Sequence, residues 1–260
     1  MHAAGKVFLF ISLIAILFSC EEGFMDNADT KTAGSGKGGS MARMTIVNNY
    51  LYAVDGSNLK VFDISKPQNP VYSNDVEIGR NIETIFGFKN HLYIGSTNAV
   101  YIYNIDDPTN PQEVTMIQHL LSCDPVVAND TVAFSTIRTT SSCRWNTWSV
   151  NELLILDVSN MSNVYTQRSY QLDFSPFGLG LKDTTLFLCK GSEGIDLYDI
   201  RNLADPLNNQ LVPFNQLDNV DAFDVIIHGD LLMVVGENGL IMYDITDLMN
   251  IQKLSEINPD

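Results

Sequence analysis

Histidine and cysteine, which supply most catalytic bases, nucleophiles and metal ligands, are scarce in this sequence. Its 260 residues include 4 of each. No His-Glu-x-x-His, paired Cys-x-x-Cys, Gly-x-Ser-x-Gly or phosphate-binding glycine motif occurs. The sequence therefore predicts no metal centre and no cofactor, and it favours a non-enzymatic protein over an enzyme.

Basic residues are few as well. The chain has 15 Lys and Arg against 31 Asp and Glu, which gives a net charge of −16. A field of that sign repels phosphate backbones, so nucleic acid is not expected as a partner. The acidic residues form no Asp-x-Asp-x-Asp-Gly loop, so calcium is not indicated either.

Long apolar faces with helical periodicity are also lacking, and the pattern that recurs is strand-like. A short apolar run that ends in Asp or Asn, followed by a turn rich in Asn and Pro, occurs five times. The terminal residues are Asp63, Asn104, Asp157, Asp199 and Asp244, so the steps between copies are 41, 53, 42 and 45 residues. A strand-like period of about 40 to 50 residues is typical of propeller blades.

Each repeat contains four candidate strands. The apolar run is the third strand, and a strand such as Leu51–Val54 comes directly before it as the second. The first strand is of the kind of Phe223–Ile227, and the fourth, after the turn, is of the kind of Glu113–Gln118. We therefore predict an all-β fold, a five-bladed β-propeller with four antiparallel strands per blade. Because open sheet edges invite aggregation, we expect residues 42–47 to close the ring by pairing with the last repeat.

The recurring Asp or Asn has a structural explanation. Its side-chain oxygen can accept a backbone N–H in the turn, as an Asx-turn. A turn needs that group in every repeat, whereas a catalytic group is usually needed once. The repetition therefore predicts a turn role for these residues.

The runs Leu59–Ser65, Leu153–Ser159 and Leu240–Thr246, each followed by an Asx-rich turn, resemble the LVIVD repeats of bacterial β-propeller proteins. The resemblance covers roughly residues 41–258. The third and fifth copies lack the final Pro of the turn, and the second has Asn104 in place of Asp. The resemblance implies export and a surface or envelope location, and it implies no particular biochemical activity.

The first 20 residues have the features of a targeting segment. Lys6 precedes the apolar run Val7–Phe18, which is too short to span a bilayer. The run leads into Leu17–Cys20, which resembles a bacterial lipobox, whose Cys is lipidated. We predict a lipoprotein signal peptide over residues 1–20, lipidation at Cys20 and an outer-membrane lipoprotein that is periplasmic or surface-exposed. The alternative is an ordinary signal peptide with an incidental Cys.

Two further segments follow. Residues 21–40 are Gly/Ser-rich and are predicted to be a flexible tether, because this composition cannot pack a core. No linker interrupts residues 41–260, which are predicted to form a single β-propeller domain.

The third repeat is irregular. From Ala133 to Asp157 the chain takes 24 steps, against 11 from Tyr52 to Asp63 in the first repeat. The insertion contains Cys143, and Cys123 falls in a connection on the same face of the same blade. We therefore predict a disulfide between Cys123 and Cys143, with Cys189 as a buried free thiol.

The face that carries this insertion, called here the insertion face, is the candidate site. Trp stacks on sugars and cations, and Arg makes forked hydrogen bonds to carboxylates. In the other interpretation, the two tryptophans pack under the loop to hold it. The candidate ligand-binding residues are Arg80, Glu83, Asp124, Arg138, Arg144, Trp145, Trp148 and Asp221.

The function that these features favour is a non-catalytic, lipid-anchored β-propeller of the bacterial outer envelope. It would bind a glycan or protein partner through the insertion face. The alternative is a propeller glycosidase or lyase that uses carboxylates at the channel mouth, where Glu83, Asp124, Asp221 and Asp224 are expected. A purely structural module of an envelope complex is a third interpretation.

Overall fold

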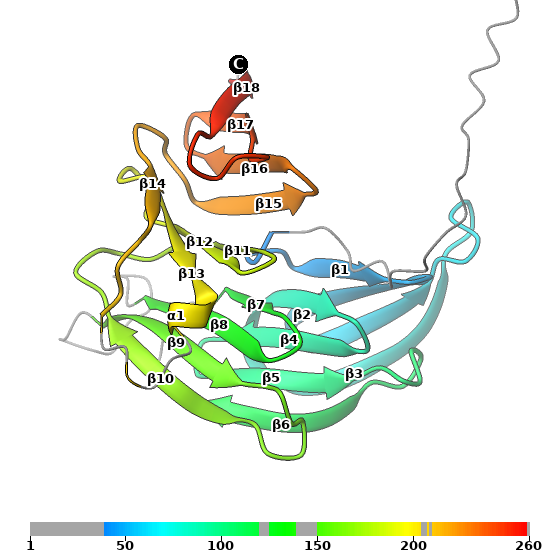
Figure 1. Cartoon of the computed structure of the whole chain (residues 1–260). Coiled ribbons are helices and arrows are strands. Elements are labelled where there is room, and N and C mark those ends of the chain that lie inside the picture. The colour runs from blue at the N-terminus through cyan, green and yellow to red at the C-terminus, as the bar shows by residue number, and fades with distance from the viewer. Residues whose placement is uncertain (1–38, 120–124, 139–149, 204–206, 208–209, 259–260) are drawn as a thin grey trace, which may run out of the picture. The chain divides into compact units, whose positions relative to one another are not determined.

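The computed structural model describes residues 39–119, 125–138, 150–203, 207 and 210–258. The chain divides into two units, Met1–Thr32 and Ala33–Asp260, and the described residues all belong to the second. Apart from the single-turn helix α1 (Ile200–Leu203), the regular structure of these residues is antiparallel β-sheet (Figure 1). Within them, no helix is long and apolar enough to cross a membrane.

The strands form four sheets. The first contains β1 (Met44–Val47), β2 (Tyr50–Asp63), β3 (Val71–Phe88), β4 (His91–Ser96), β5 (Ala99–Asn104) and β6 (Gln112–Gln118). The second contains β7 (Val126–Ala128), β8 (Val132–Arg138), β9 (Asn151–Asp157) and β10 (Tyr165–Gln171). The third contains β11 (Leu179–Lys182), β12 (Thr185–Cys189), β13 (Ile195–Asp199) and β14 (Asn215–Leu217). The fourth contains β15 (Asp224–His228), β16 (Leu231–Gly236), β17 (Gly239–Asp244) and β18 (Gln252–Ile257).

The prediction of five blades is wrong, because the structure has four. The first two repeats share the six-stranded sheet, in the order β1-β2-β3-β4-β5-β6. The 18 residues of β3 run unbroken and pair with β2 from Val71 to Glu77 and with β4 from Ile82 to Phe88. The expected boundary between two blades therefore lies inside one strand, and the five copies of the repeat are distributed over four sheets.

The Asx-turn prediction is confirmed at all five copies. In each, the side-chain oxygen of the Asp or Asn accepts the backbone N–H two residues later, at 2.8 to 2.9 Å. The donors are Ser65, Asp106, Ser159, Arg201 and Thr246. The local sequence thus determines where the apolar strand of each repeat ends.

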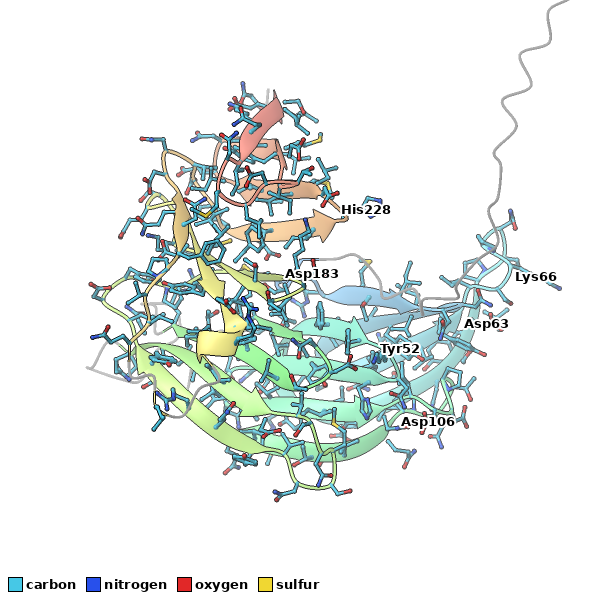
Figure 2. All side chains as sticks on the ribbon, in the orientation of Figure 1. Tyr52, Asp63, Lys66, Asp106, Asp183 and His228 are labelled. Carbon is cyan, nitrogen blue, oxygen red and sulfur yellow. The ribbon has the colours of Figure 1, made fainter. Side chains whose placement is uncertain are left out.

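A second bond fixes these turns against the hairpin between the first two strands of the same repeat. The N–H directly after the Asp or Asn donates to a carbonyl of that hairpin at 2.8 to 2.9 Å. The five pairs are Ile64 with Asn49, Ile105 with Asn90, Val158 with Thr131, Ile200 with Thr184, and Ile245 with Asp230. These turns form one side of the described structure, called here the turn face, on which Figure 2 labels Asp63, Asp106, Asp183 and His228.

The core lies between consecutive sheets. Tyr93 and Ile102 of the first sheet pack with Ala133 and Leu156 of the second. Phe134 and Ile155 of the second sheet pack with Leu186 and Tyr198 of the third. Phe187 and Leu197 of the third pack with Val225 and Val234 of the fourth. Each sheet is therefore stabilised mainly by burial of apolar side chains against its neighbours in the series.

The predicted ring closure is also wrong. β1 pairs with β2, from Met44 opposite Ala53 to Val47 opposite Tyr50, and does not extend the last sheet. The segment just before β1 instead contacts the fourth sheet through a side chain. Ser40 Oγ donates to Asp224 Oδ1 at 3.0 Å, and Met41 N donates to Asp224 Oδ2 at 3.1 Å.

Candidate functional site

Half of the predicted ligand-binding residues lie outside the described part of the chain. These are Asp124, Arg144, Trp145 and Trp148, and Cys20, Cys123 and Cys143 lie outside it as well. The lipidation at Cys20 and the disulfide therefore stay predictions. The structure describes Arg80, Glu83, Arg138 and Asp221, and it shows Cys189 as a free, buried thiol, as expected.

Arg138 is the predicted site residue with the most informative surroundings. It ends β8, in the first part of the insertion, and its Cζ lies 4.0 Å from the ring centroid of Phe177. The Phe177 ring stacks in turn on Phe223, with centroids 5.3 Å apart and an angle of 25° between the planes. Arg138 belongs to the second sheet, and Phe177 and Phe223 lie just before the first strands of the third and fourth sheets. These three residues, called here the aromatic row, therefore connect three blades at the insertion face.

Backbone contacts hold the aromatic row in place. Thr136 Oγ1 donates to the Phe177 carbonyl at 2.8 Å, and Phe177 N donates to the Cys189 carbonyl at 2.9 Å. Gly191, at φ +62°, faces the ring so closely that a Cβ there would lie 2.9 Å from Phe177 Cε2. The ring is thus enclosed by backbone on one side and available to Arg138 on another, as a preorganised cation–π pair.

Beside the row lies a buried ion pair. Lys190 Nζ is 2.7 Å from Asp196 Oδ1, and the two side chains are 10% and 5% exposed. The Asp196 carboxylate also accepts Tyr198 Oη at 2.8 Å and Gln216 Nε2 at 2.9 Å. Burial, together with the adjacent Asp196 carboxylate, raises the pKa of Tyr198. Because every oxygen of Asp196 is engaged within the third sheet, this network serves to position β12, β13 and β14.

The other predicted residues have mixed outcomes. Asp221 Oδ2 accepts the N–H of Glu237 at 2.8 Å, so its carboxylate fixes the hairpin between β16 and β17. Arg80 is exposed and Glu83 is half-buried on β3, in the stretch where that strand changes partner from β2 to β4. The structure thus places Arg138 in a formed row, and it gives Asp221 a role in loop geometry.

Asp224 is the carboxylate with the most unusual environment. Gly39 and Gly178 enclose it so tightly that a Cβ on either would lie 2.0 or 2.1 Å from a carboxylate oxygen. Burial raises its pKa to about 6. Ser40 and Met41 donate to its oxygens, and Ser40 Oγ accepts the N–H of Leu179 at 2.6 Å. The carboxylate therefore binds the N-terminal segment of the chain itself.

A pocket of about 390 Å³ lies on the turn face, away from the aromatic row. It is lined by Val47, Asn48, Asn49, Tyr50, Tyr52, Lys89, Asn90, Ile105, Asp106 and Pro108. Its polar groups are largely occupied: Asn90 Nδ2 donates to Asp106 at 2.6 Å, and Tyr52 donates to the Pro108 carbonyl at 3.0 Å. We give more weight to the insertion face, because the pocket walls are the same turns that recur structurally in every repeat.

Sequence reasoning missed Phe177 and Phe223. The signal that could have found them is positional, since each is an aromatic residue just before the first strand of its sheet, β11 or β15. No group of three or more His, Cys, Asp or Glu side chains in the described residues is arranged to hold a metal ion. Chemically, the described part of the insertion face offers a cation over one aromatic ring, which stacks on a second.

Comparison with known proteins agrees with this geometry. The LVIVD repeat model matches residues 38–77 and 148–171. A computationally designed protein is similar, with a TM-score of 0.57 and 13% identity over 84% of this chain and 61% of its own. A functionally unknown protein from Desulfotomaculum acetoxidans has a TM-score of 0.60 and 11% identity, covering 82% of this chain and 67% of its own. A periplasmic gluconolactonase from Pseudomonas aeruginosa has a TM-score of 0.57 and 10% identity, covering 81% and 67%.

At such identities the likeness to solved structures shows the fold alone. No curated protein matches the sequence. The chain spans only 61% of the designed protein and 67% of the gluconolactonase, so these proteins contain more chain than the part aligned here. The repeated Asx-turns, the stacked antiparallel sheets and the structural neighbours show a β-propeller fold, and the matched residues show that the chain contains LVIVD repeats.

Proposed function

We propose that this β-propeller is a non-catalytic binding module of the bacterial outer envelope, held by a lipid at Cys20. It binds a glycan or protein partner through the insertion face. The observation that carries the proposal is the aromatic row, in which Arg138 stacks on Phe177 immediately before the loop that contains Trp145 and Trp148.

The chemistry of this face suits planar and apolar surfaces that also carry polar groups. Sugar rings and aromatic side chains both stack on Trp, and Arg makes forked hydrogen bonds to carboxylates. Because backbone contacts already hold Phe177, little ordering of this part of the site is needed on binding, which favours affinity. The net charge of −16 favours a neutral or basic partner over an anionic one.

The catalytic alternative gains no support from the described carboxylates. Asp224 has a pKa suited to proton transfer, but both of its oxygens accept bonds from residues 40 and 41. Asp221 is committed to the N–H of Glu237. The gluconolactonase similarity, at 10% identity, is a likeness of fold.

The binding proposal is tested by screening the full chain on arrays of glycans and of envelope-protein peptides, then comparing variants. Trp145→Ala and Trp148→Ala should weaken binding of the partner found, and should leave the melting temperature nearly unchanged. Lys66→Ala, an exposed change on the turn face, is the control and should alter neither. Buried tryptophans would behave in the opposite way, since truncation then costs about 3–5 kcal/mol of stability. Unchanged binding with a large loss of stability would therefore overturn the proposed site.

The anchor is tested separately. Cys20→Ala should move the protein from the detergent phase to the aqueous phase on phase separation, because a lipid anchor is what holds it to membranes. Equal partitioning of the variant and the parent would contradict the lipid anchor. It would not affect the binding proposal, which has its own test.

A further inference from the structure

The inner sheets and the last sheet differ in how they bury their second strand. Every residue of β12 is buried, and β8 is buried except at its final residue. Since successive side chains of a strand point to opposite faces, such strands are covered on both faces. In β16, by contrast, only Leu232 and Val234 are buried, which are alternate residues. The fourth sheet therefore buries one face and leaves the other open.

The open face of the fourth sheet carries a cluster of apolar side chains, with His228, Asp244 and Ser255 at its margins. Its cross-strand pairs put Ile226 opposite Met233, Met233 opposite Met242, and Val235 opposite Leu240. The full set, called here the trailing face, is Ile226, Leu231, Met233, Val235, Leu240, Met242 and Ile257. None of these residues belongs to a buried cluster of the described chain, whereas Val225, Leu232, Val234 and Tyr243 on the other face pack against the third sheet.

The first sheet has a matching open face at the other end of the series. In β1, Thr45 and Val47 are buried, while Met44 and Ile46 are 60% and 42% exposed. Met44 lies opposite Ala53, and Ile46 lies opposite Leu51. These four residues, Met44, Ile46, Leu51 and Ala53, are called here the leading face.

We propose that the trailing face of one molecule packs on the leading face of a second copy of this chain, head to tail. Within the chain, each sheet already stacks on the next through apolar faces, the fourth on the third through Val225 and Val234 (Figure 1). A second copy would continue that series, because the leading face of its first sheet would cover the trailing face of the fourth sheet. Two solved proteins of similar fold are longer, and 61% and 67% of their lengths are aligned here.

Such a contact is heterologous, since two different surfaces meet. Repeated contacts of this kind form either a closed ring or an open filament. The contact is independent of the partner proposed for the insertion face. Each copy carries a net charge of −16, so charge repulsion opposes the apolar contact. Screening by salt should therefore tighten the association, whereas a contact made by salt bridges would weaken.

The test is sedimentation velocity of the full chain in non-ionic detergent over a series of concentrations. Met233→Lys with Met242→Lys disrupts the trailing face, and Met44→Lys with Ile46→Lys disrupts the leading face. Val212→Lys is the matched control, because Val212 is an exposed apolar residue between α1 and β14. We expect the parent and the control to associate, more strongly at high salt, and each double variant to raise the dissociation constant at least tenfold.

Mixing the two double variants separates a head-to-tail contact from all others. Each retains one intact face, so an equimolar mixture should restore a 1:1 complex, which also shows that both variants are folded. A monomeric parent at every concentration would overturn the proposal. So would double variants that associate like the parent, or a mixture that stays monomeric.

Discussion

The guanidinium of Arg138 lies over the ring of Phe177, with Cζ 4.0 Å from the ring centroid, although 39 positions separate the two residues in the sequence. The contact links the end of β8 to the segment before β11, and so couples the second and third sheets at the insertion face. Thr136, two residues before Arg138, bonds to the backbone of the same phenylalanine. The position of this ring is therefore set by residues that lead directly into the insertion.

Gly191→Ala should disturb that ring. The new Cβ would lie 2.9 Å from Phe177 Cε2 at a φ of +62°, so both strain and a clash result. We expect a loss of about 2 kcal/mol in the free energy of unfolding, measured by urea denaturation, and weaker partner binding. Gly229→Ala is the control, with a φ of +59° and no atom within 4 Å of the added Cβ. Equal losses in the two variants would mean that Phe177 is not confined by Gly191.

Asp224 should make the chain more stable in mild acid. Its pKa is raised from 3.8 to about 6 by burial, so the folded state takes up a proton at a higher pH than the unfolded state does. The free energy of unfolding should therefore rise as the pH falls from above 6 toward 4, by up to about 3 kcal/mol from this group. Asp224→Asn removes the titration, and the difference between parent and variant, followed by urea denaturation across that range, isolates it. If the difference in the free energy of unfolding between parent and variant did not change with pH, the raised pKa of Asp224 would be contradicted.

Asp157→Ala should cost stability, because it removes the acceptor of the turn and the acceptor of the bond that Tyr165 Oη donates at 3.1 Å. The Asp157 carboxylate accepts the Ser159 N–H at 2.9 Å and the Ser159 hydroxyl at 2.6 Å, and these bonds lower its pKa. We expect a loss of about 1 kcal/mol near neutral pH that shrinks as the pH falls through the lowered pKa. Asp157→Asn keeps the acceptor, as Asn104 does in the second repeat, and should lose less. The two variants are compared by thermal denaturation. A larger loss of stability for Asp157→Asn than for Asp157→Ala would contradict the turn role.

Lys190→Met should destabilise the third sheet strongly, because it leaves the carboxylate of Asp196 buried without its cation. The expected loss is about 3–5 kcal/mol. Adding Asp196→Asn removes the stranded charge and keeps an oxygen for Tyr198, so the double variant should recover much of that loss. A double variant no better than Lys190→Met would show that the pair acts through packing and not through charge.

The sequence was sufficient for features that depend on near neighbours. The strands and the Asx-turns follow from residues a few positions apart, and all five turns formed as expected. The number of sheets was mispredicted, because the pairing of β3 with both β2 and β4 is a choice of partners that the spacing of repeats does not encode. The spacing of the repeats predicted separate blades, whereas β3 continues from the first repeat into the second as one strand.

The candidate site divides in the same way. Arg138 was found because it belongs to an insertion that is visible in the spacing of the repeats. Its partner Phe177 was missed, since nothing local joins residues 39 positions apart. Asp224 was expected at the channel mouth, and its partner Ser40, 184 positions away, lies in a stretch whose composition indicated only a tether.

The bonds from Ser40 and Met41 to Asp224 set the path that mechanical load takes through the protein. A pull on the chain before residue 39 meets the first strand of the fourth sheet and, through Leu179, the first strand of the third, before it reaches β1. The force thus acts on the first and fourth sheets at the same time, instead of separating β1 from the first sheet alone. A force applied to the chain before residue 39 would therefore be distributed over the first, third and fourth sheets.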